Sequence, residues 1–273
     1  MTALAPLLLF VTWLTIRDLH YWIANLFCPR RRVGSVAPSD HPGHDGVWPR
    51  FQAPIQGNDS RSPCPALNAL ANHDILPRSG KHITYKQLSH AIQHAYNLAP
   101  SLADQLTASA YQLDQGRGWI DLQDLSALNV IQHDASFTPH FCSDQSVPHP
   151  DLVDKFLSHA LNGKSLSLDD IVYFSGFRRS ECRRTNGQYS MTWSFLHQFF
   201  RSGNGALMYG DVKDLRVWLS EERFPDGWEP RNRGALGHTI LQAMSMLLII
   251  EFNINEKQKL WSEDTALYEV RDL

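Results

Sequence analysis

Apolar residues recur at helical spacing along most of the chain beyond residue 63. Thr84 is placed to cap a helix over residues 85–96, whose apolar positions lie three and four apart. A proline in the first helical position predicts further helices from Pro65 and Pro100. The same reasoning predicts helices at 150–161, 168–175, 190–201, 212–220 and 235–252, with another helix start at Asp121. Alternating strand patterns are scarce, so we predict a mainly α fold with room for one short hairpin.

The first 28 residues form a distinct apolar segment. Its opening run, "ALAPLLLFVTWLTI", has 14 uncharged residues, whereas a bilayer span needs about 20. Arg17, Asp18 and His20 then interrupt before apolar residues resume up to Phe27. A membrane anchor, a cleaved secretory signal and an ordinary buried helix all stay open, and the anchor is preferred because a basic n-region and an A-x-A-like cleavage site are missing.

Arginines at residues 30–32 follow this segment directly. A basic cluster beside an anchor favours a cytoplasmic location for the chain that follows. We therefore expect association with an internal membrane such as the endoplasmic reticulum, with secretion as the alternative.

Composition places the remaining chain among globular proteins. Residues 29–47 are rich in Pro, Gly, Asp and His and predict a linker, which leaves 48–273 as one domain. With 273 residues, of which 43% are hydrophobic, the chain can bury a full core. The net charge of -3 and the absence of a basic stripe argue against nucleic acid as a partner.

Four cysteines, Cys28, Cys64, Cys142 and Cys182, lie far apart and form no CxxC pair. Neither a zinc site nor a dense disulfide framework follows from such spacing. Cys64 stands between two prolines at the start of a predicted helix, in "SPCPALNALANHDILPRSG". The free N–H groups of a helix start favour a thiolate, which would serve as a nucleophile or a metal ligand. The alternative is a small buried hydrophobic residue.

The residues around Cys64 resemble the proximal segment of the haem-thiolate peroxidases, the fungal family of chloroperoxidase and the unspecific peroxygenases. The matching positions are Pro63, Cys64, Pro65, Leu67, Asn68, Ala71, Asn72, His73, Leu76, Pro77 and Arg78. A second family motif, Glu-His-Asp-x-Ser, is matched by His133, Asp134 and Ser136. A third, Glu-Arg-Leu-Pro-x-Gly-Trp, resembles residues 222–228. The matches follow the family's order from Trp48 to about Phe252.

This resemblance implies a mostly helical, single haem-binding domain with one b-type haem, whose iron is bound by the thiolate of Cys64. It also implies oxidation of a hydrophobic small molecule with hydrogen peroxide, as in fungal secondary metabolism. We expect Asn68 and His73 in the same helix to have structural roles, because buried polar side chains need partners.

The resemblance fails at two positions on the distal side of the predicted haem. The family's acid–base glutamate, which moves a proton between the oxygens of peroxide, corresponds to Asn204, and an amide cannot shuttle that proton. The glutamate that helps to bind magnesium or manganese in the family corresponds to Gln132, a poorer ligand for a hard cation. We assign His133, Asp134 and Asn204 to the distal site on this resemblance.

Three explanations of the missing carboxylates stay open. His133 can act as the base, since the pKa of histidine suits proton transfer at neutral pH. Glu181 can reach the site, although pairing with the neighbouring arginines is the simpler interpretation. Alternatively, the haem serves a non-redox dehydration, isomerisation or cyclisation. A haem carrier without enzymatic activity is a further hypothesis.

Overall fold

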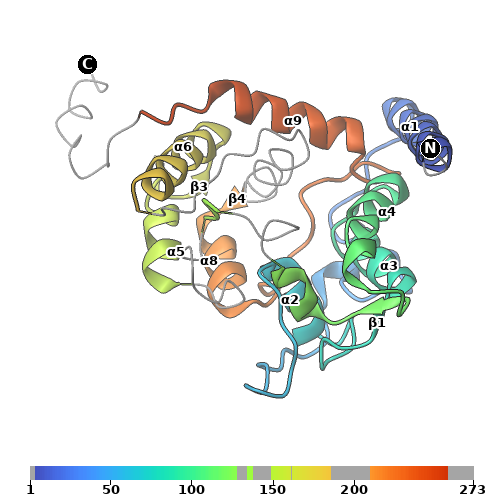
Figure 1. Ribbon diagram of the computed structural model, residues 1–273, viewed down its shortest axis with the longest axis horizontal. Coiled ribbons are helices and arrows are strands. Elements are labelled where there is room, and N and C mark those ends of the chain that lie inside the picture. The colour runs from blue at the N-terminus through green and yellow to red at the C-terminus, as the bar shows by residue number, and fades with distance from the viewer. Residues whose placement is uncertain (1–3, 128–133, 138–148, 161, 186–209, 258–273) are drawn as a thin grey trace. The chain divides into compact units, whose positions relative to one another are not determined.

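The computed structural model describes residues 4–127, 134–137, 149–160, 162–185 and 210–257. It divides into two compact units. The first unit comprises Met1–Gln132 and Val217–Ser245, and the second comprises His133–Arg216 and Met246–Leu273. Both units are built mainly from helices (Figure 1). The mainly α fold class is thereby confirmed.

Most elements of the first unit precede residue 127. They are α1 (Leu4–Phe27), α2 (Pro65–Asn72), β1 (Ile83–Thr84), α3 (Tyr85–Ala95), α4 (Pro100–Ala108) and β2 (Trp119–Ile120), with short 3₁₀ helices at His44–Gly46, Tyr111–Leu113 and Leu122–Ser126. Two helices continue from one unit into the other. These are α8 (Val212–Glu221) and α9 (Ile240–Asn253).

The core of the first unit surrounds α2. Ala69, Leu70 and Ala71 have no exposed surface, and the small alanine side chains allow neighbouring elements to approach the helix closely. Asn68 and Asn72 are equally buried on the same helix. Because α2 lies inside the core, the direction of the chain at Cys64 is set by packing on every side.

The helix starts predicted from capping signals are confirmed. Thr84 caps α3 through a capping box, in which its hydroxyl accepts the N–H of Gln87 and the Gln87 side chain accepts the N–H of Thr84. Pro65 and Pro100 are the first residues of α2 and α4. Prolines fit there because the first turn of a helix makes no use of their missing N–H.

A helix begins after Asp121 as predicted, but it is a short 3₁₀ helix. Other predicted boundaries were wrong, because α6 (Leu168–Thr185) continues ten residues past the predicted end at 175. Helix α9 begins at Ile240 rather than at 235, because the preceding residues form a loop in which Leu236 donates to Asn25 and His238 to Asn97. The helix predicted at 190–201 lies outside the described residues.

Among the described residues, each unit contains one short antiparallel strand pair, which is one pair more than predicted. In the first unit Ile83 pairs with Ile120, and in the second β3 (Ser165–Leu166) pairs with β4 (Gly210–Asp211). With two residues per strand, these pairs join loops rather than form layers.

The second unit packs α5 (Pro150–Leu157) against α6. Phe156 and Phe174 face each other with ring centroids 4.9 Å apart, and Phe137 lies 4.9 Å from Phe156. Phe137 is therefore a core residue, whereas Phe195, Phe199 and Phe200 lie outside the described residues. Two polar contacts join α6 to α9, because both guanidinium NH groups of Arg179 donate to Glu251.

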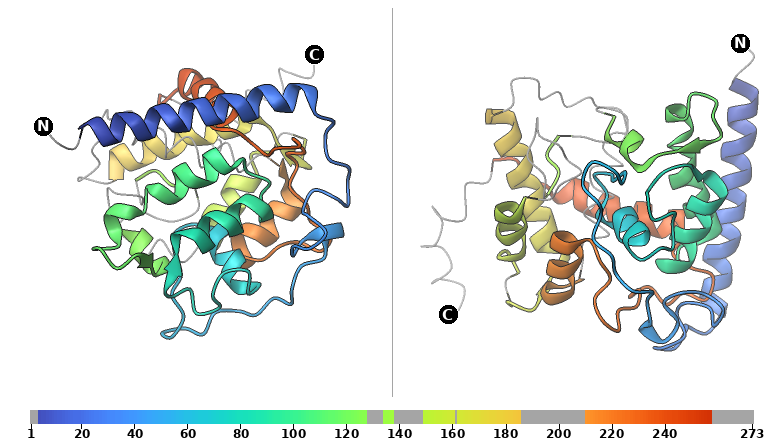
Figure 2. Two further views of the ribbon diagram at one scale, coloured as in Figure 1. Left: turned by 90° about the vertical axis from the view of Figure 1, so that its right-hand side faces the viewer. Right: turned by 90° about the horizontal axis from the view of Figure 1, so that it is seen from below.

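The charged residues that interrupt the apolar N-terminal segment attach α1 to the first unit. Helix α1 runs alongside α4 (Figure 1 and Figure 2), and Arg17 forms an ion pair with Asp104 at 2.7 Å. Asp18 is 4% exposed and accepts hydrogen bonds from the N–H groups of Ile240 and Leu241 at the start of α9. Within the described chain, no helix combines the length and the hydropathy that crossing a bilayer requires.

Close approach of two loops requires a glycine at position 80. Gly80 has φ +66, and a Cβ atom there would lie 2.0 Å from the carbonyl oxygen of Ser60. The adjoining residues Arg61 and Ser62 lead into Cys64. This contact therefore fixes the position of residues 60–62, which lead into the predicted haem-binding loop.

We predict that Gly80→Ala lowers the free energy of unfolding by more than about 1 kcal/mol, because the side chain requires both a strained φ and a displaced backbone. Gly57→Ala is the matched control, since Gly57 also has a positive φ, +76, but open space around it. Urea denaturation of both variants provides the measurement. Equal losses would show that the close approach to Ser60 contributes nothing.

Candidate active site

Cys64 is the N-cap residue of α2. Its backbone is extended, with φ -99 and ψ 105, and the next residue, Pro65, begins the helix. The N–H groups of Leu67 and Ala66, two of the donors that a helix start leaves without partners, favour the charged form of the thiol, although the Cys64 side chain makes no capping hydrogen bond. The sulfur thus lies at the positive end of the helix dipole, as the sequence predicts.

The net effect of this environment on the thiol differs from the prediction. Burial raises the pKa of the Cys64 thiol, and this outweighs the N–H groups of Leu67 and Ala66, which lower it. Desolvation penalises the charged thiolate more than the two N–H groups compensate. A bound cation would favour the thiolate, because its charge opposes this penalty.

Hydrogen bonds of Asn68 hold the loop that carries Cys64. The Asn68 amide oxygen accepts the N–H of Ser62 at 2.8 Å, and its nitrogen donates to the Ser62 carbonyl at 2.7 Å. The Ser62 hydroxyl in turn accepts the N–H of Cys64 at 3.2 Å. The position of the cysteine backbone thus depends on a side chain one turn further along α2.

Glu222 completes this network from a distant part of the sequence. Asn68 donates its second amide N–H to the Glu222 carboxylate at 2.7 Å, across 154 residues of chain. Glu222 is 9% exposed and has a positive φ of 51, which directs its backbone back toward α2. The Glu222 carbonyl accepts a hydrogen bond from Asn72 at 3.0 Å.

His73 joins the same two segments at the end of α2. Its Nε2 accepts the N–H of Phe224 at 3.1 Å, and its Nδ1 lies 2.6 Å from the carbonyl of Pro49, to which it donates. These contacts fix the tautomer, and burial lowers the pKa of His73. The structural roles expected of Asn68 and His73 agree with these contacts.

Aromatic rings pack behind the same segments. Trp48 stacks on Phe224 with centroids 3.9 Å apart, and its indole N–H donates to the carbonyl of Trp228 at 2.9 Å. The stretch from Trp48 through the Cys64 segment and the stretch at residues 222–228 resemble one family in two separate parts of the sequence. The structure brings these two together in the first unit.

Two residues that support the loop were not predicted. Arg61 is buried and its guanidinium donates to the Asn72 side chain at 3.0 and 2.7 Å. Tyr96, the C-cap residue of α3, donates its hydroxyl to the carbonyl of Ala66 at 2.7 Å. Neither has a sequence signal of its own, because an arginine before a turn and a tyrosine at a helix end are common on protein surfaces.

The predicted distal residues are only partly described. Asp134 lies in a turn of the second unit, in which Arg178 donates to the carbonyl of Ser136 at 2.8 Å and Ala135 donates its N–H to the sulfur of Cys182. Gln132, His133 and Asn204 lie outside the described residues. Their assignment stays a prediction from the sequence.

Glu181 is engaged with an arginine. It forms an ion pair with Arg178 one turn earlier on α6, and its side chain is 27% exposed. Pairing with a neighbouring arginine was the simpler of the two interpretations of this residue. The contact also keeps a charge partner beside the buried Arg178 guanidinium.

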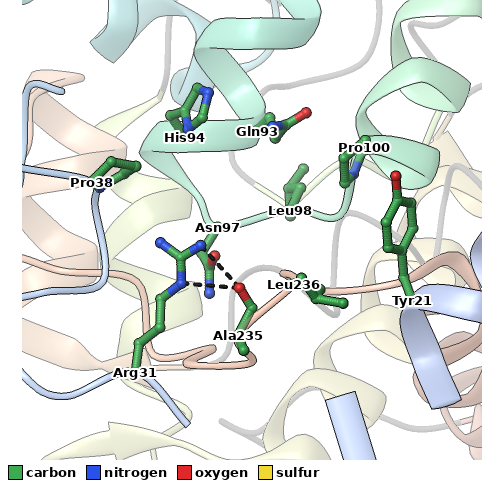
Figure 3. A pocket seen from close by; sticks show the side chains of 10 residues that line it. All are labelled: Tyr21, Arg31, Pro38, Gln93, His94, Asn97, Leu98, Pro100, Ala235 and Leu236. Carbon is green, nitrogen blue, oxygen red and sulfur yellow. Dashed lines mark hydrogen bonds between the residues drawn. The ribbon is translucent and has the colours of Figure 1, made fainter. Parts of the chain in front are cut away.

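A cavity of about 150 Å³ lies in the first unit beside the loop that follows α1 (Figure 3). Tyr21, Arg31, His94 and Leu236 are among its lining residues, and Cys64 is not. Figure 3 shows two hydrogen bonds from the Arg31 guanidinium to the carbonyl of Ala235, at 3.2 and 3.0 Å. A third, at 2.7 Å, joins it to the carbonyl of Val36, so Arg31 holds loops together.

The family is decided by comparison with known proteins. The sequence model of the family described as "Peroxidase, family 2" matches residues 48–233. The chain belongs to this family. The resemblance to the haem-thiolate peroxidases is thereby confirmed, and with it a relationship to haem-dependent oxidoreductases.

Three relatives match shorter segments. A chloroperoxidase of Leptoxyphium fumago is 34% identical over 87 residues, which cover 29% of this chain and 23% of the relative. A dothistromin biosynthesis peroxidase of Dothistroma septosporum is 41% identical over 63 residues, 23% of this chain and 14% of the relative. An aromatic peroxygenase of Cyclocybe aegerita is 39% identical over 61 residues, 22% and 16% of the two chains. The matched part is thus less than a quarter of each relative.

The proximal residues of this peroxidase-family chain fit a haem iron. A half-buried cysteine at the N-cap of a helix presents one sulfur, and hydrogen bonds fix the loop that carries it. A ferric iron would supply the positive charge that favours the thiolate over the thiol. Cys64 is the residue that would hold the haem.

Glu222 gives this part of the chain a pH-dependent stability. Burial raises the pKa of its carboxyl to about 7, although the hydrogen bond from Asn68 and the charge of Arg61 oppose the rise. The folded chain therefore binds this proton more tightly than the unfolded chain. The stabilisation is complete below about pH 4.5 and declines as the pH rises through about 7.

We predict that Glu222→Gln removes this decline, because the amide keeps the acceptor for Asn68 but does not ionise. The wild-type chain should lose stability relative to the variant between about pH 4.5 and 7 in urea unfolding. Glu221→Gln, at the exposed neighbouring carboxylate, is the matched control. If both variants show the same pH dependence, burial of Glu222 is not its source.

Proposed function

We propose that the protein is a haem-thiolate oxidoreductase that uses hydrogen peroxide to oxidise a hydrophobic small molecule. The observation that carries this proposal is the position of Cys64, which is the N-cap residue of α2 and lies at the positive end of that helix. The match to the peroxidase family over residues 48–233 supports it. A role in the synthesis of a secondary metabolite is part of the proposal, and one relative has such a role by its name.

Each residue of the proximal network has a distinct part in this proposal. Cys64 provides the axial thiolate, and the N–H groups of Ala66 and Leu67 withdraw electron density from its sulfur. Asn68 fixes the position of the loop, because it binds Ser62 and the Ser62 hydroxyl accepts the N–H of Cys64. When bound, the haem supplies the iron at which peroxide is reduced, and an axial thiolate favours cleavage of the O–O bond.

We predict that Cys64→Ala abolishes the thiolate signature of the haem protein. Reduction under carbon monoxide should give the red-shifted Soret band of a thiolate-ligated haem in the wild-type protein and not in the variant. Cys28→Ala, at the half-buried cysteine after α1, should retain the band. If Cys64→Ala showed a band at the same position, Cys64 would not be the iron ligand.

The second candidate function is a haem-dependent dehydration, isomerisation or cyclisation. The observation that favours it is the replacement of two family glutamates by neutral amides at Gln132 and Asn204. Loss of the acid–base carboxylate weakens proton transfer to peroxide but leaves the haem and an apolar substrate site in place. The same replacement predicts that no magnesium or manganese binds there.

Catalase distinguishes the two functions in an assay with candidate hydrophobic substrates. Peroxide-dependent oxidation should stop when catalase is added, and its product should contain added oxygen or be oxidatively coupled. Turnover that catalase leaves unchanged, with an isomeric or dehydrated product, would establish the non-redox function instead.

The same assay identifies the distal base. If His133 serves as the base, His133→Ala should lower peroxide-dependent turnover by about 100-fold or more, the usual contribution of general acid–base catalysis. If the base has been lost, Asn204→Glu should raise peroxide-dependent turnover instead. A protein that binds haem and shows neither response nor any turnover is a haem carrier.

A further inference from the structure

Helix α1 has an exposed apolar face over most of its length. Leu9, Ile16 and Ile23 lie seven residues apart and are 72%, 65% and 43% exposed. Residues seven apart are two helical turns apart and share one face. The flanking residues Trp13, Leu19, Leu26 and Phe27 are exposed as well. We call these seven residues the apolar stripe.

The opposite face of α1 is attached to the first unit. Leu14 and Asp18 are 7% and 4% exposed, and Asp18 accepts hydrogen bonds from Ser101 and from the start of α9. Asn25 donates to the carbonyl of Gly237 at 2.9 Å and accepts the N–H of Leu236 at the same distance. The polar residues of α1 thus hold the helix against the protein with the apolar stripe outward.

Exposed arginines follow the stripe. Arg30 and Arg32 are exposed, and in the described part of the chain neither has an ion-pair partner. Arg31 is different, because its guanidinium is held by the carbonyls of Ala235 and Val36. Arg233, whose carbonyl accepts the N–H of Arg31, is also exposed. Positive charge without a carboxylate partner therefore adjoins the C-terminal end of the stripe.

We propose that α1 is a surface-binding helix for an anionic lipid bilayer. The helix lies in the plane of the membrane, the apolar stripe enters the boundary between headgroups and acyl chains, and Arg30 and Arg32 contact anionic headgroups. This binding is independent of the haem site proposed above.

The composition and the dimensions of the stripe suit a lipid surface. It carries leucine, isoleucine, phenylalanine and tryptophan, the residues that bury well at a membrane interface, and basic residues adjoin it. From Leu9 to Phe27 it extends about 27 Å at 1.5 Å per residue. The hydrogen bonds of Asp18 and Asn25 tie the helix to the folded unit, which directs the stripe away from the protein.

A second copy of the chain fits this surface less well. Pairing of two stripes would cover the apolar side chains but would bring no carboxylate of α1 to Arg30, Arg32 and Arg233, because the two acidic residues that hold α1 to the first unit are already engaged. Asp104 is paired with Arg17, and Asp18 is buried beneath α1. An anionic bilayer satisfies both the apolar stripe and the arginines at once.

The test is co-sedimentation of the full-length haem protein with vesicles. We use phosphatidylcholine alone and phosphatidylcholine containing about one third phosphatidylserine, a composition that gives a negative surface potential. The wild-type protein should bind the anionic vesicles more tightly, and Ile16→Asp with Ile23→Asp should weaken binding by more than about tenfold, since two large apolar side chains are lost. Val47→Asp with Ile55→Asp is the matched control, at side chains 70% and 61% exposed elsewhere in the first unit.

A second pair of variants tests the arginines. Arg30→Gln with Arg32→Gln should weaken binding to anionic vesicles by about fivefold for each charge and leave binding to neutral vesicles unchanged. Arg50→Gln with Lys86→Gln removes the same charge from exposed positions away from α1 and should have little effect. All variants should keep the wild-type Soret band and thermal midpoint, which separates a loss of membrane binding from misfolding or loss of haem.

Several results would overturn the proposal. One is a wild-type protein that does not sediment with anionic vesicles, and another is an equal loss of binding in the stripe variant and its control. Light scattering that shows a dimer dispersed by Ile16→Asp with Ile23→Asp would assign the stripe to a second copy. An intact mass showing that the isolated protein lacks α1 would assign it to a removed leader. Retention of the protein in membranes after an alkaline carbonate wash would contradict surface binding.

Discussion

Buried polar side chains on α2 need hydrogen-bond partners, and much of the first unit is arranged to supply them. Asn68 is satisfied by Ser62 and Glu222, Asn72 by Arg61 and the carbonyl of Glu222, and both residues are fully buried. An unsatisfied buried amide would cost about 1–3 kcal/mol, so each contact selects one arrangement of the chain. The loop that carries Cys64 is held in place by this selection.

Two opposing effects act on the pKa of the Cys64 thiol at the start of α2. The N–H groups of Leu67 and Ala66 lower the pKa of the Cys64 thiol, yet burial raises it by more. Such a site is poorly suited to a free nucleophile and well suited to a metal, because a cation removes the penalty that burial imposes. Burial also raises the pKa of Glu222, so the charged forms of both side chains are disfavoured in this part of the protein.

Helix α1 shows how polar residues in an apolar segment are used. Arg17, Asp18 and Asn25 bind the first unit, and from Trp13 onward the exposed large apolar side chains lie away from the face that carries Asp18 and Asn25. A helix with this division cannot be hydrophobic all round, and its exposed face requires a partner of its own. Helix α2, which carries the proposed haem ligand at its start, and helix α1 therefore belong to one unit but make separate contacts.

The sequence by itself determined the local features of this protein. Proline and threonine signals located the starts of α2, α3 and α4, and the residues around Cys64 identified the family, because caps and ligand motifs depend on neighbours in the chain. Only the tertiary structure decided that Glu222 is the partner of Asn68, that Arg61 supports Asn72, and that burial dominates the pKa of Cys64. It also decided which face of α1 is free. These depend on contacts between residues up to 154 positions apart, and burial is a property of the folded chain rather than of any short segment.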